Sequence, residues 1–253
     1  MKKLVAIGGG HIGRLGPVST TPIDKEIIRL SGKKNPRLLF VPTASSDLEV
    51  YCEVARKYFG KLGCDVDVLY LVKEKPALKE IEKKIFNSDI VYVGGGSTLK
   101  MMMVWRKLGV DKVLKLAYER GVVLSGKSAG SICWFDSGIS NSRKYRNPKN
   151  WEFINVKGLG LVKGANCPHY DKEPQGESRH DDFGKMIAKT GGFGIAIDNN
   201  CAIEFIDGKY FKVINSQPGA GAFRVYKKDG KVVSQKIDKK AEMIPIDELY
   251  ETI

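Results

Sequence analysis

One five-residue segment of this chain has the residue types and spacing of a hydrolase nucleophile. Gly126-Lys-Ser-Ala-Gly130 fits the pattern Gly-x-Ser-x-Gly, between the apolar segment 122–124 and a helix-compatible segment at 131–135. A serine at such a strand-to-helix turn has a strained backbone that exposes its hydroxyl, and the glycines allow neighbouring elements to pack closely. The pattern predicts Ser128 as a nucleophile, with the Ala129 N–H facing a developing oxyanion. An ordinary Gly/Ser loop is the alternative.

A serine nucleophile needs a base, and the chain contains three histidines, at positions 11, 169 and 180. His169 lies in Cys167-Pro-His-Tyr170, shortly after a predicted strand at 158–162, so a proline-stiffened loop can place it at a strand end. We therefore predict His169 as the general base. The residues alone leave open which acid orients it, and the candidates are Glu152, Asp171, Asp181, Asp182 and Asp198.

A second glycine-rich segment, Gly8-Gly-Gly-His-Ile-Gly13, matches the Gly-x-Gly-x-x-Gly pattern of dinucleotide-binding sites. Such a site also needs a helix that begins at the last glycine and an acidic residue about twenty positions later. Here Gly16 and Pro17 interrupt any helix, and Lys33 and Lys34 stand where the acid is expected. We therefore expect no NAD site. The glycines predict a tight loop over the end of the first strand, close to whatever binds there.

Strands alternate with helices over the first two thirds of the chain. Short apolar segments predict strands at 1–7, 36–41, 65–71, 89–93 and 122–124, and helical spacing of apolar residues predicts helices between them. This alternation indicates a parallel sheet covered on both faces, which binds ligands at the carboxyl ends of its strands. Asp207-Gly208 and Asp229-Gly230 each lie between β-rich segments and predict two tight hairpins. We expect one domain over residues 1–253.

Composition excludes several other classes of protein. The chain has 253 residues and a formal net charge of +13, but its lysines occur as scattered pairs, which favours a solvated basic surface over a nucleic-acid site. No segment approaches the ~20 apolar residues of a membrane span, and the apolar segment 4–7 is too short for a signal peptide. Five scattered cysteines without a Cys-x-x-Cys pair predict free thiols, no metal site and a cytoplasmic location.

Taken together, the segments resemble peptidase family S51, the group of aspartyl dipeptidase (peptidase E) and cyanophycinase, along nearly the whole chain. The resemblance rests on Phe40-Val-Pro-Thr-Ala-Ser45, Val93-Gly-Gly-Gly-Ser-Thr98, Gly126-Lys-Ser-Ala-Gly130, Cys167-Pro-His-Tyr170, and Gly176-Glu-Ser-Arg179 with Asp182. It implies an α/β fold with three layers. In this fold a mostly parallel sheet carries helices on both faces, like class I glutamine amidotransferases, with β-hairpins added at the C-terminal end.

The resemblance also implies hydrolysis of short peptides by Ser-His-acid chemistry without a cofactor. It makes Ser128 the nucleophile and His169 the base. Backbone N–H groups of Gly95 or Gly96 and of Ala129 would hold the oxyanion. The third member is an acid in this family, and we favour Asp198, which closes the segment 194–197, over Glu152. Arg179 is the candidate for binding a substrate carboxylate, because a guanidinium gives permanently charged, bidentate recognition; a surface ion pair with Glu177 or Asp182 is its alternative role.

Two residues depart from the family pattern and leave aspartyl specificity open. Lys127 precedes the serine where relatives often have a neutral residue, and Cys167 replaces a common asparagine. The segment 141–150 carries four cations, and at the rim of the site it would favour anionic peptides, whose turnover should then fall as salt rises.

An esterase and an inactive binding module are the alternative functions, whereas a glutamine amidotransferase would need cysteine at position 128. We expect a small peptide as partner, and a homodimer is left open.

Overall fold

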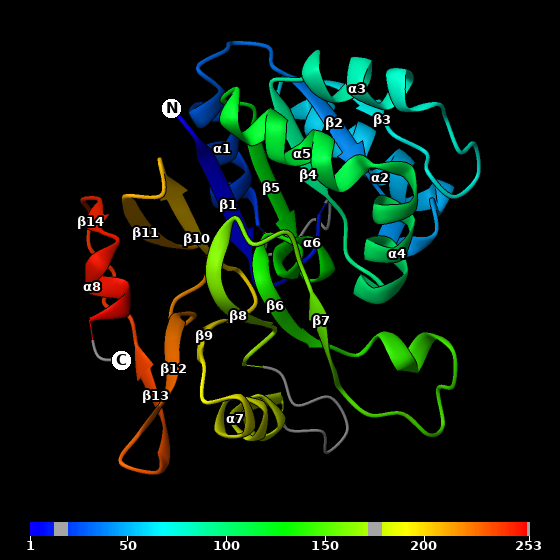
Figure 1. The fold of residues 1–253 in the computed structure, drawn as a ribbon. Helices are drawn as coiled ribbons and strands as arrows, with labels where there is room; N and C mark the ends of the chain where they lie inside the picture. Colours follow the sequence, from blue (N-terminus) through cyan, green and yellow to red (C-terminus); the bar gives the residue numbers. More distant parts are fainter. Residues whose placement is uncertain (13–19, 172–178, 252–253) are drawn as a thin grey trace.

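Two β-sheets organise the computed structural model, which describes residues 1–12, 20–171 and 179–251 (Figure 1). Along the chain the elements are β1 (Lys3–Ile7), α1 (Thr21–Ser31), β2 (Arg37–Val41), η1 (Thr43–Ser45), α2 (Glu49–Lys61), β3 (Asp65–Val68), α3 (Leu78–Phe86), β4 (Ile90–Val93), α4 (Thr98–Leu108), α5 (Val110–Glu119), β5 (Val123–Lys127), α6 (Ala129–Ile132), β6 (Phe135–Ser140), η2 (Ser142–Tyr145), β7 (Ile154–Lys157), β8 (Val162–Pro168), α7 (Arg179–Thr190), β9 (Phe193–Ile197), β10 (Cys201–Ile206), β11 (Tyr210–Asn215), β12 (Ala222–Lys228), β13 (Lys231–Lys236), β14 (Ile244–Pro245) and α8 (Asp247–Tyr250).

The larger sheet has the strand order β14-β11-β10-β1-β5-β4-β2-β3. Its five strands β1, β5, β4, β2 and β3 run parallel, and β10, β11 and β14 extend it in antiparallel pairing. Helices connect most of the parallel strands, as a parallel pairing requires. The mixed α/β class expected from the alternation of strands and helices is therefore confirmed.

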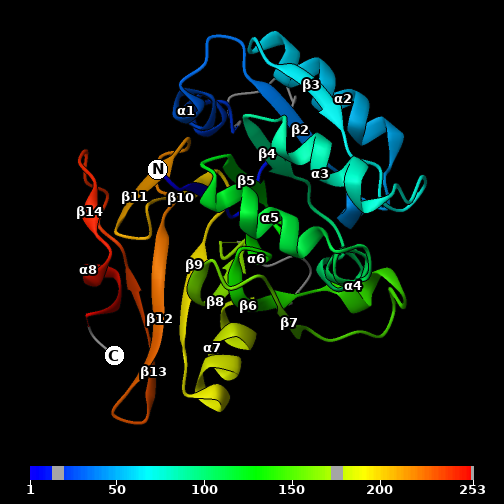
Figure 2. The same ribbon diagram turned by 45° about the horizontal axis from the view of Figure 1, so that its top comes forward.

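Helices cover both faces of the parallel part of this sheet (Figures 1 and 2). On one face, Val5 and Ile7 of β1 pack in a buried cluster with residues of α1 and α2, including Ile27 and Phe59. On the other face, the alternate residues Leu4 and Ala6 belong to a cluster with α3, α4 and α5. Successive side chains of a strand point to opposite faces, so a continuously apolar strand such as β1 is buried on both.

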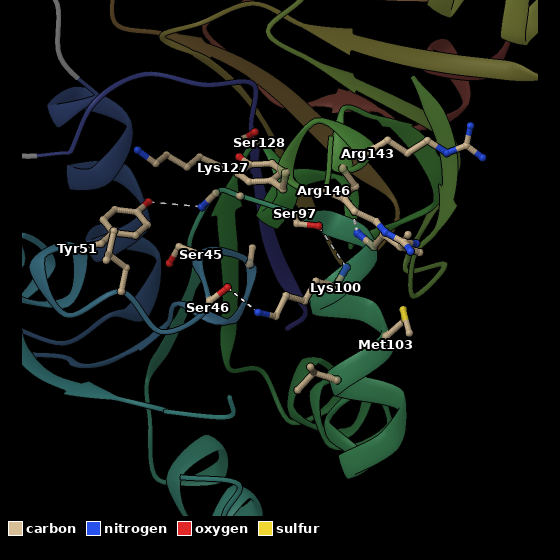
Figure 3. Close-up of a pocket in the computed structure, with 18 of the residues that line it drawn as sticks. Ser45, Ser46, Tyr51, Ser97, Lys100, Met103, Lys127, Ser128, Arg143 and Arg146 are labelled. Atoms are coloured by element: carbon tan, nitrogen blue, oxygen red, sulfur yellow. Dashed lines mark hydrogen bonds between the residues drawn. The ribbon is translucent and has the colours of Figure 1, made fainter. Parts of the chain in front are cut away.

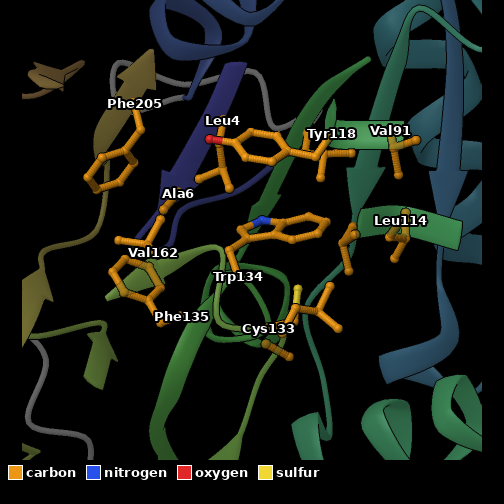
Figure 4. Packing of buried hydrophobic residues seen from close by; sticks show 14 of the residues in the cluster. Leu4, Ala6, Val91, Leu114, Tyr118, Cys133, Trp134, Phe135, Val162 and Phe205 are labelled. Carbon is orange, nitrogen blue, oxygen red and sulfur yellow. The ribbon is translucent and has the colours of Figure 1, made fainter. Parts of the chain in front are cut away.

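A second sheet, with the order β13-β12-β9-β8-β6-β7, was not expected from the sequence, which indicated one mostly parallel sheet. The reason lies in the hydrogen bonding of β5, which already pairs with β1 on one side and β4 on the other. Because both edges of β5 are paired, the chain after α6 cannot add a strand beside β5, and β6 pairs instead with β7 and β8. The two sheets share one core, in which Phe135 of β6 meets Phe205 of β10 edge to face (Figure 4).

Asp-Gly turns connect the antiparallel pairs β10–β11 and β12–β13. Asp207 and Gly208 have φ values of 54° and 64°, and Asp229 and Gly230 have 50° and 78°. Positive φ at both central residues is the geometry of a type I′ turn, whose twist matches that of the flanking strands. These turns fix the register of β10 with β11 and of β12 with β13.

No helix among the described residues has the length and apolar character needed to cross a bilayer. The 13-residue α2 is the longest of them, and it buries only one side of its surface, through Cys52, Ala55 and Phe59. Its length is well below the ~20 residues of a typical span.

A buried carboxyl group between α1 and α2 makes stability depend on pH. Asp24 accepts hydrogen bonds from the hydroxyls of Thr20 (2.7 Å) and Tyr58 (2.8 Å), but its Oδ1 has no partner among the described residues. Burial raises the pKa of Asp24 from 3.8 to about 6. The folded state therefore binds this proton more tightly than the unfolded state, so the contribution of Asp24 to stability falls as pH rises from 4 to 6.

We expect Asp24→Asn to stabilise the protein above pH 6 by about 2 kcal/mol, because the amide needs no ionisation in the core. The difference in the free energy of unfolding between Asp24→Asn and the wild type should appear between pH 4 and 6 and stay constant above pH 6. Urea unfolding at pH 4, 6 and 8 measures it, with the exposed Asp229→Asn as the control for loss of one negative charge. Equal destabilisation of Asp24→Asn at all three pH values would contradict the expectation.

Candidate active site

Ser128 occupies the turn between β5 and α6 in a strained backbone conformation, with φ 56° and ψ −112°. Its N–H donates to the Ile7 carbonyl (3.1 Å), which ties the turn to the end of β1. A Cβ at Gly126 would lie 2.6 Å from the Gly130 carbonyl oxygen, and one at Gly130 would overlap the Val93 carbonyl. Both glycines are therefore required by close backbone packing, and the turn presents the serine at the carboxyl end of the sheet.

His169 follows the last residue of β8 and also has a positive φ, 56°. Its N–H donates to the Gly8 carbonyl (3.2 Å), so the backbone of the histidine is fixed to the loop after β1. Its ring Nδ1 lies 2.7 Å from Oδ1 of Asn199. The backbone N–H and the Nδ2 of Asn199 both donate to Oδ1 of Asp171, at 2.8 and 2.7 Å. The imidazole is thus held through an asparagine that is itself held by a carboxylate.

The two acids that the sequence favoured for orienting the histidine make other contacts. Asp198 accepts a hydrogen bond from the Gly221 N–H (2.8 Å), and burial raises its pKa to about 6. Glu152 is exposed and forms an ion pair with Arg143. Because neighbouring side chains in extended chain point in opposite directions, only one of residues 198 and 199 can face the imidazole. Asn199, one residue beyond the predicted Asp198, contacts the imidazole.

The loop after β1 packs directly against this histidine. A Cβ at Gly9 would overlap both the His169 ring and the Asn199 amide oxygen, and the Gly9 carbonyl accepts the Asn200 N–H (3.0 Å). The glycines thus form the tight loop that the sequence predicted, and they lie close to the candidate site. Residues Gly13 to Pro17 of the same sequence pattern lie outside the described residues.

A cavity of about 1090 Å³ opens at the carboxyl end of the parallel strands, and Ser128 lines it (Figure 3). His169 lines the same cavity. Loops after β1, β2 and β4, the start of α4 and the η2 segment form its walls. One part of the wall is apolar and is made by Leu48, Leu99, Met103, Val104 and Tyr145. The volume is at the upper end of the range for small-molecule sites, so the cavity has room for a short peptide.

Backbone N–H groups lie beside the serine. A Cβ built on Gly95 would lie 3.4 Å from the Ser128 Cβ and 3.9 Å from its Oγ, so the turn after β4 adjoins the hydroxyl. The Gly95 N–H points to the hydroxyl of Tyr51 at 3.4 Å, a long hydrogen bond that a better acceptor can replace. Ala129 begins α6, and the N–H groups of a first helical turn lack intrahelical acceptors. These groups can therefore stabilise negative charge that develops next to Ser128.

The cavity is basic. Lys100, Lys127, Arg143 and Arg146 line it, and no Asp or Glu does so among the described residues. Lys127 donates to the Gly10 carbonyl (3.0 Å), and its Nζ lies 5.5 Å from the centre of the Tyr51 ring. Burial lowers the pKa of Lys127 to about 8. The ammonium group is thus charged at neutral pH, one residue before Ser128.

Arg179, which the sequence proposed as a carboxylate-binding residue, is placed behind the histidine loop. Its side chain is 6% exposed, donates to the Pro168 carbonyl (3.3 Å) and lies over the Phe153 ring at 4.9 Å. It is absent from the described residues that line the cavity. The guanidinium therefore supports the residue that precedes His169. Gly176 to Ser178, which share its sequence motif, lie outside the described residues.

Two residues that sequence reasoning did not place in the site are Tyr51 and Asn199, and Asp171 was considered only as a direct partner of the imidazole. An asparagine orients the histidine in Cys-His-Asn hydrolases, so Asn199 could have been weighed as a third member. Asp171 was one of five acids considered, but only the folded chain shows that it contacts Asn199 instead of the imidazole. Tyr51 lies on the helix after β2, and no local pattern distinguishes it from an ordinary apolar-face residue.

A comparison with protein families decides between the hydrolase classes that share such a turn. The model of peptidase family S51 matches residues 4–213, a range that includes Ser128, His169 and Asn199. The chain belongs to peptidase family S51. The sequence resemblance is thereby confirmed, and the S51 chain is expected to be a peptidase.

Relatives of this S51 chain carry consistent names. It is 34% identical over 226 residues to the uncharacterized peptidase YgaJ of Bacillus subtilis strain 168, a match that covers 89% of this chain and 92% of YgaJ. It is 28% identical over 149 residues to peptidase E of Nostoc sp. strain PCC 7120, covering 58% and 57% of the two chains. The crystal structure of a peptidase from an acI-B1 Actinobacterium superposes with a TM-score of 0.73 over 97% of each chain, and at 18% identity this shows a shared fold.

Proposed function

We propose that this S51 peptidase hydrolyses short peptides through a serine acyl-enzyme. The observation that carries the proposal is the pairing of a strained serine with a held histidine in one cavity. Ser128 has φ 56°, both residues line the same space, and the His169 ring is fixed by a 2.7 Å contact with Asn199. Strain at a serine and a fixed orientation of a base are what nucleophilic catalysis needs.

In the proposed mechanism, His169 takes the proton of the Ser128 hydroxyl as the oxygen attacks the peptide carbonyl carbon. The Ala129 N–H and an N–H of the Gly95-Gly96 turn bind the oxyanion, and Tyr51 gives up its contact with the Gly95 N–H. His169 then protonates the leaving amine, and the acyl-enzyme forms. Water, activated by the same histidine, attacks the ester and releases Ser128. Every step uses side chains and backbone groups of the described residues.

The substrates we propose are short peptides with a carboxylate near the scissile bond, and Asp-X dipeptides are the first to examine. Four cationic side chains line the cavity, of which Arg143 is paired with Glu152, and charge complementarity of this kind raises both specificity and the rate of encounter. A panel of dipeptides and tripeptides that differ only in an aspartate, asparagine or leucine at the first position tests the proposal. Aspartyl peptides should have the highest kcat/KM, and absence of turnover for the whole panel would contradict a peptidase of short substrates.

Lys127 makes a pH-dependent contribution to this preference. Its pKa of about 8 means that its positive charge is present below pH 8 and is lost as the pH rises through that value. We therefore expect KM for aspartyl peptides to rise several-fold between pH 7 and 9, while KM for matched leucyl peptides stays constant. Lys127→Met should have the same raised KM at pH 7 and pH 9, and the KM of the wild type should approach that value at pH 9. The same change of KM with pH for both peptides in the wild type would contradict a role for this charge.

We also propose a cytoplasmic location and the three-layer arrangement of class I glutamine amidotransferases. All five cysteines are buried and unpaired, which supports a reducing compartment such as the cytoplasm. Helices on both faces of the parallel strands support the arrangement of class I glutamine amidotransferases. The hydroxyl of Ser128 stands where those enzymes need a thiol, so the chemistry proposed is that of a serine hydrolase.

A further inference from the structure

The hydrogen bonds around Asn199 have only one consistent direction. An ionised carboxylate accepts hydrogen bonds and donates none. Oδ1 of Asp171, 2.7 Å away, must therefore face the NH₂ group of Asn199, and this leaves the amide oxygen of Asn199 directed at His169. The backbone N–H of Asn199 donates to the same carboxylate oxygen at 2.8 Å, so the two donors of one residue are fixed by one acceptor. The asparagine amide cannot flip without the loss of a charge-assisted bond.

The orientation of the amide in turn determines the protonation of the imidazole. An amide oxygen is an acceptor, so the His169 Nδ1, 2.7 Å away, has to be the protonated nitrogen. The Nε2 atom then keeps its lone pair. This is the tautomer in which a histidine can take a proton from a serine, and a wrong tautomer is the main defect when the orienting acid of a serine protease is replaced by its amide. In this chain the amide is the native residue, and a carboxylate behind it fixes its direction.

We propose that Asp171 is a positioning residue of the active site, which sets the working tautomer of His169 through the side chain of Asn199. The inference rests on the proposed function for the roles of Ser128 and His169. It differs from the sequence expectation of a direct Ser-His-acid triad, because the acid touches neither the serine nor the imidazole. The exposed Asp171 carboxylate accepts both N–H groups of Asn199, and the amide oxygen of Asn199 in turn faces the histidine.

The first test is Asp171→Asn, which keeps the shape of the side chain. The new amide can accept from the two N–H groups of Asn199 only through a neutral oxygen, and it can also turn its NH₂ group toward Asn199, so the direction of the Asn199 amide is held less firmly. We expect kcat for an aspartyl dipeptide to fall about 10- to 100-fold, the loss typical when a residue that orients a metal-binding side chain is replaced. KM should stay within about twofold, since Asp171 does not line the cavity. A purely structural role would change the melting temperature and leave kcat per folded molecule unchanged.

A charge exchange gives the sharper test. In the double variant Asp171→Asn/Asn199→Asp, the new carboxylate at position 199 accepts the His169 Nδ1–H directly. The new amide at 171 can donate to that carboxylate through its NH₂ group or accept the backbone N–H of residue 199 through its oxygen, but one atom cannot do both. The single tautomer is restored, so kcat should recover to well above that of Asp171→Asn. Asn199→Asp alone places two carboxylates in contact and should be less active than the double variant. If Asp171→Asn does not fold, recovery of both fold and turnover in the double variant still supports the proposal, and its failure overturns it.

The controls separate this inference from the proposed function. Asp229→Asn removes a negative charge at an exposed turn between β12 and β13 and should retain wild-type kcat. Peptide turnover by Ser128→Ala would defeat the proposed function whatever Asp171 does. An inactive Ser128→Ala together with a wild-type kcat for folded Asp171→Asn, or a double variant no better than Asp171→Asn, would overturn the role of Asp171 alone.

Discussion

Ser128→Ala is expected to lower kcat for a short peptide substrate by at least about 10⁴-fold while the protein stays folded. The hydroxyl is the atom that forms the acyl-enzyme, and no other group of the turn can replace it. KM should change little, because the cavity walls and their cations stay in place. Steady-state kinetics with an aspartyl dipeptide, supported by circular dichroism and thermal melting, measures the effect.

The melting temperature of Ser128→Ala is an informative second readout. A φ of 56° is strained in a residue other than glycine, so Ser128→Ala keeps the backbone strain of the turn. Alanine makes no side-chain contact that offsets this strain. Ser88→Ala is a matched control, because Ser88 is buried just before β4, at the amino-terminal end of the parallel strands, and the cavity lies at their carboxyl end. It should retain wild-type turnover. Comparable kcat values for Ser128→Ala and Ser88→Ala would contradict a covalent role for Ser128.

Gly9→Ala is expected to lower kcat by about 100-fold or more, since displacement of a catalytic group by an ångström has this effect. The added methyl group overlaps the His169 ring and the amide oxygen of Asn199, so one of the two must move. Either movement lengthens the 2.7 Å contact that orients the imidazole. Peptide turnover, measured well below the melting temperature of the variant, gives the effect.

Gly60→Ala is the matched control for this prediction. Gly60 lies in α2, and a Cβ there meets no atom within 4 Å. Alanine also favours helix over glycine, so this variant should be as active as the wild type and slightly more stable. Wild-type kcat in Gly9→Ala would show that the loop after β1 does not constrain the histidine.

The strands that place the serine could be predicted from sequence because their signals are local. A continuously apolar strand, two glycines and a helix start define the turn at Ser128, and the two glycines are needed for contacts within a few residues or with the adjacent strand. The second sheet has no such signal. It forms because both edges of β5 are already paired, and this depends on the order of all strands in the first sheet.

The partners of the histidine were harder to predict for a similar reason. Residues 198 and 199 both follow β9, and a shift of one residue in an extended segment exchanges the side chain that faces the site. The register set by β12 pairing with β9 directs Asp198 to Gly221 and Asn199 to His169. The position of Arg179 was hard to predict for a related reason. Its sequence motif does not show that the guanidinium is buried against the ring of Phe153.

Active-site labelling with diisopropyl fluorophosphate, followed by peptide mapping in a mass spectrometer, tests the central claim most directly. The reagent reacts with a serine hydroxyl that a neighbouring base activates, so it reports the nucleophile without knowledge of the substrate. We predict one adduct per chain, located on Ser128, with labelling slowed in Gly9→Ala and absent in Ser128→Ala. No adduct in the folded wild-type protein, or an adduct on a different residue, would contradict the account.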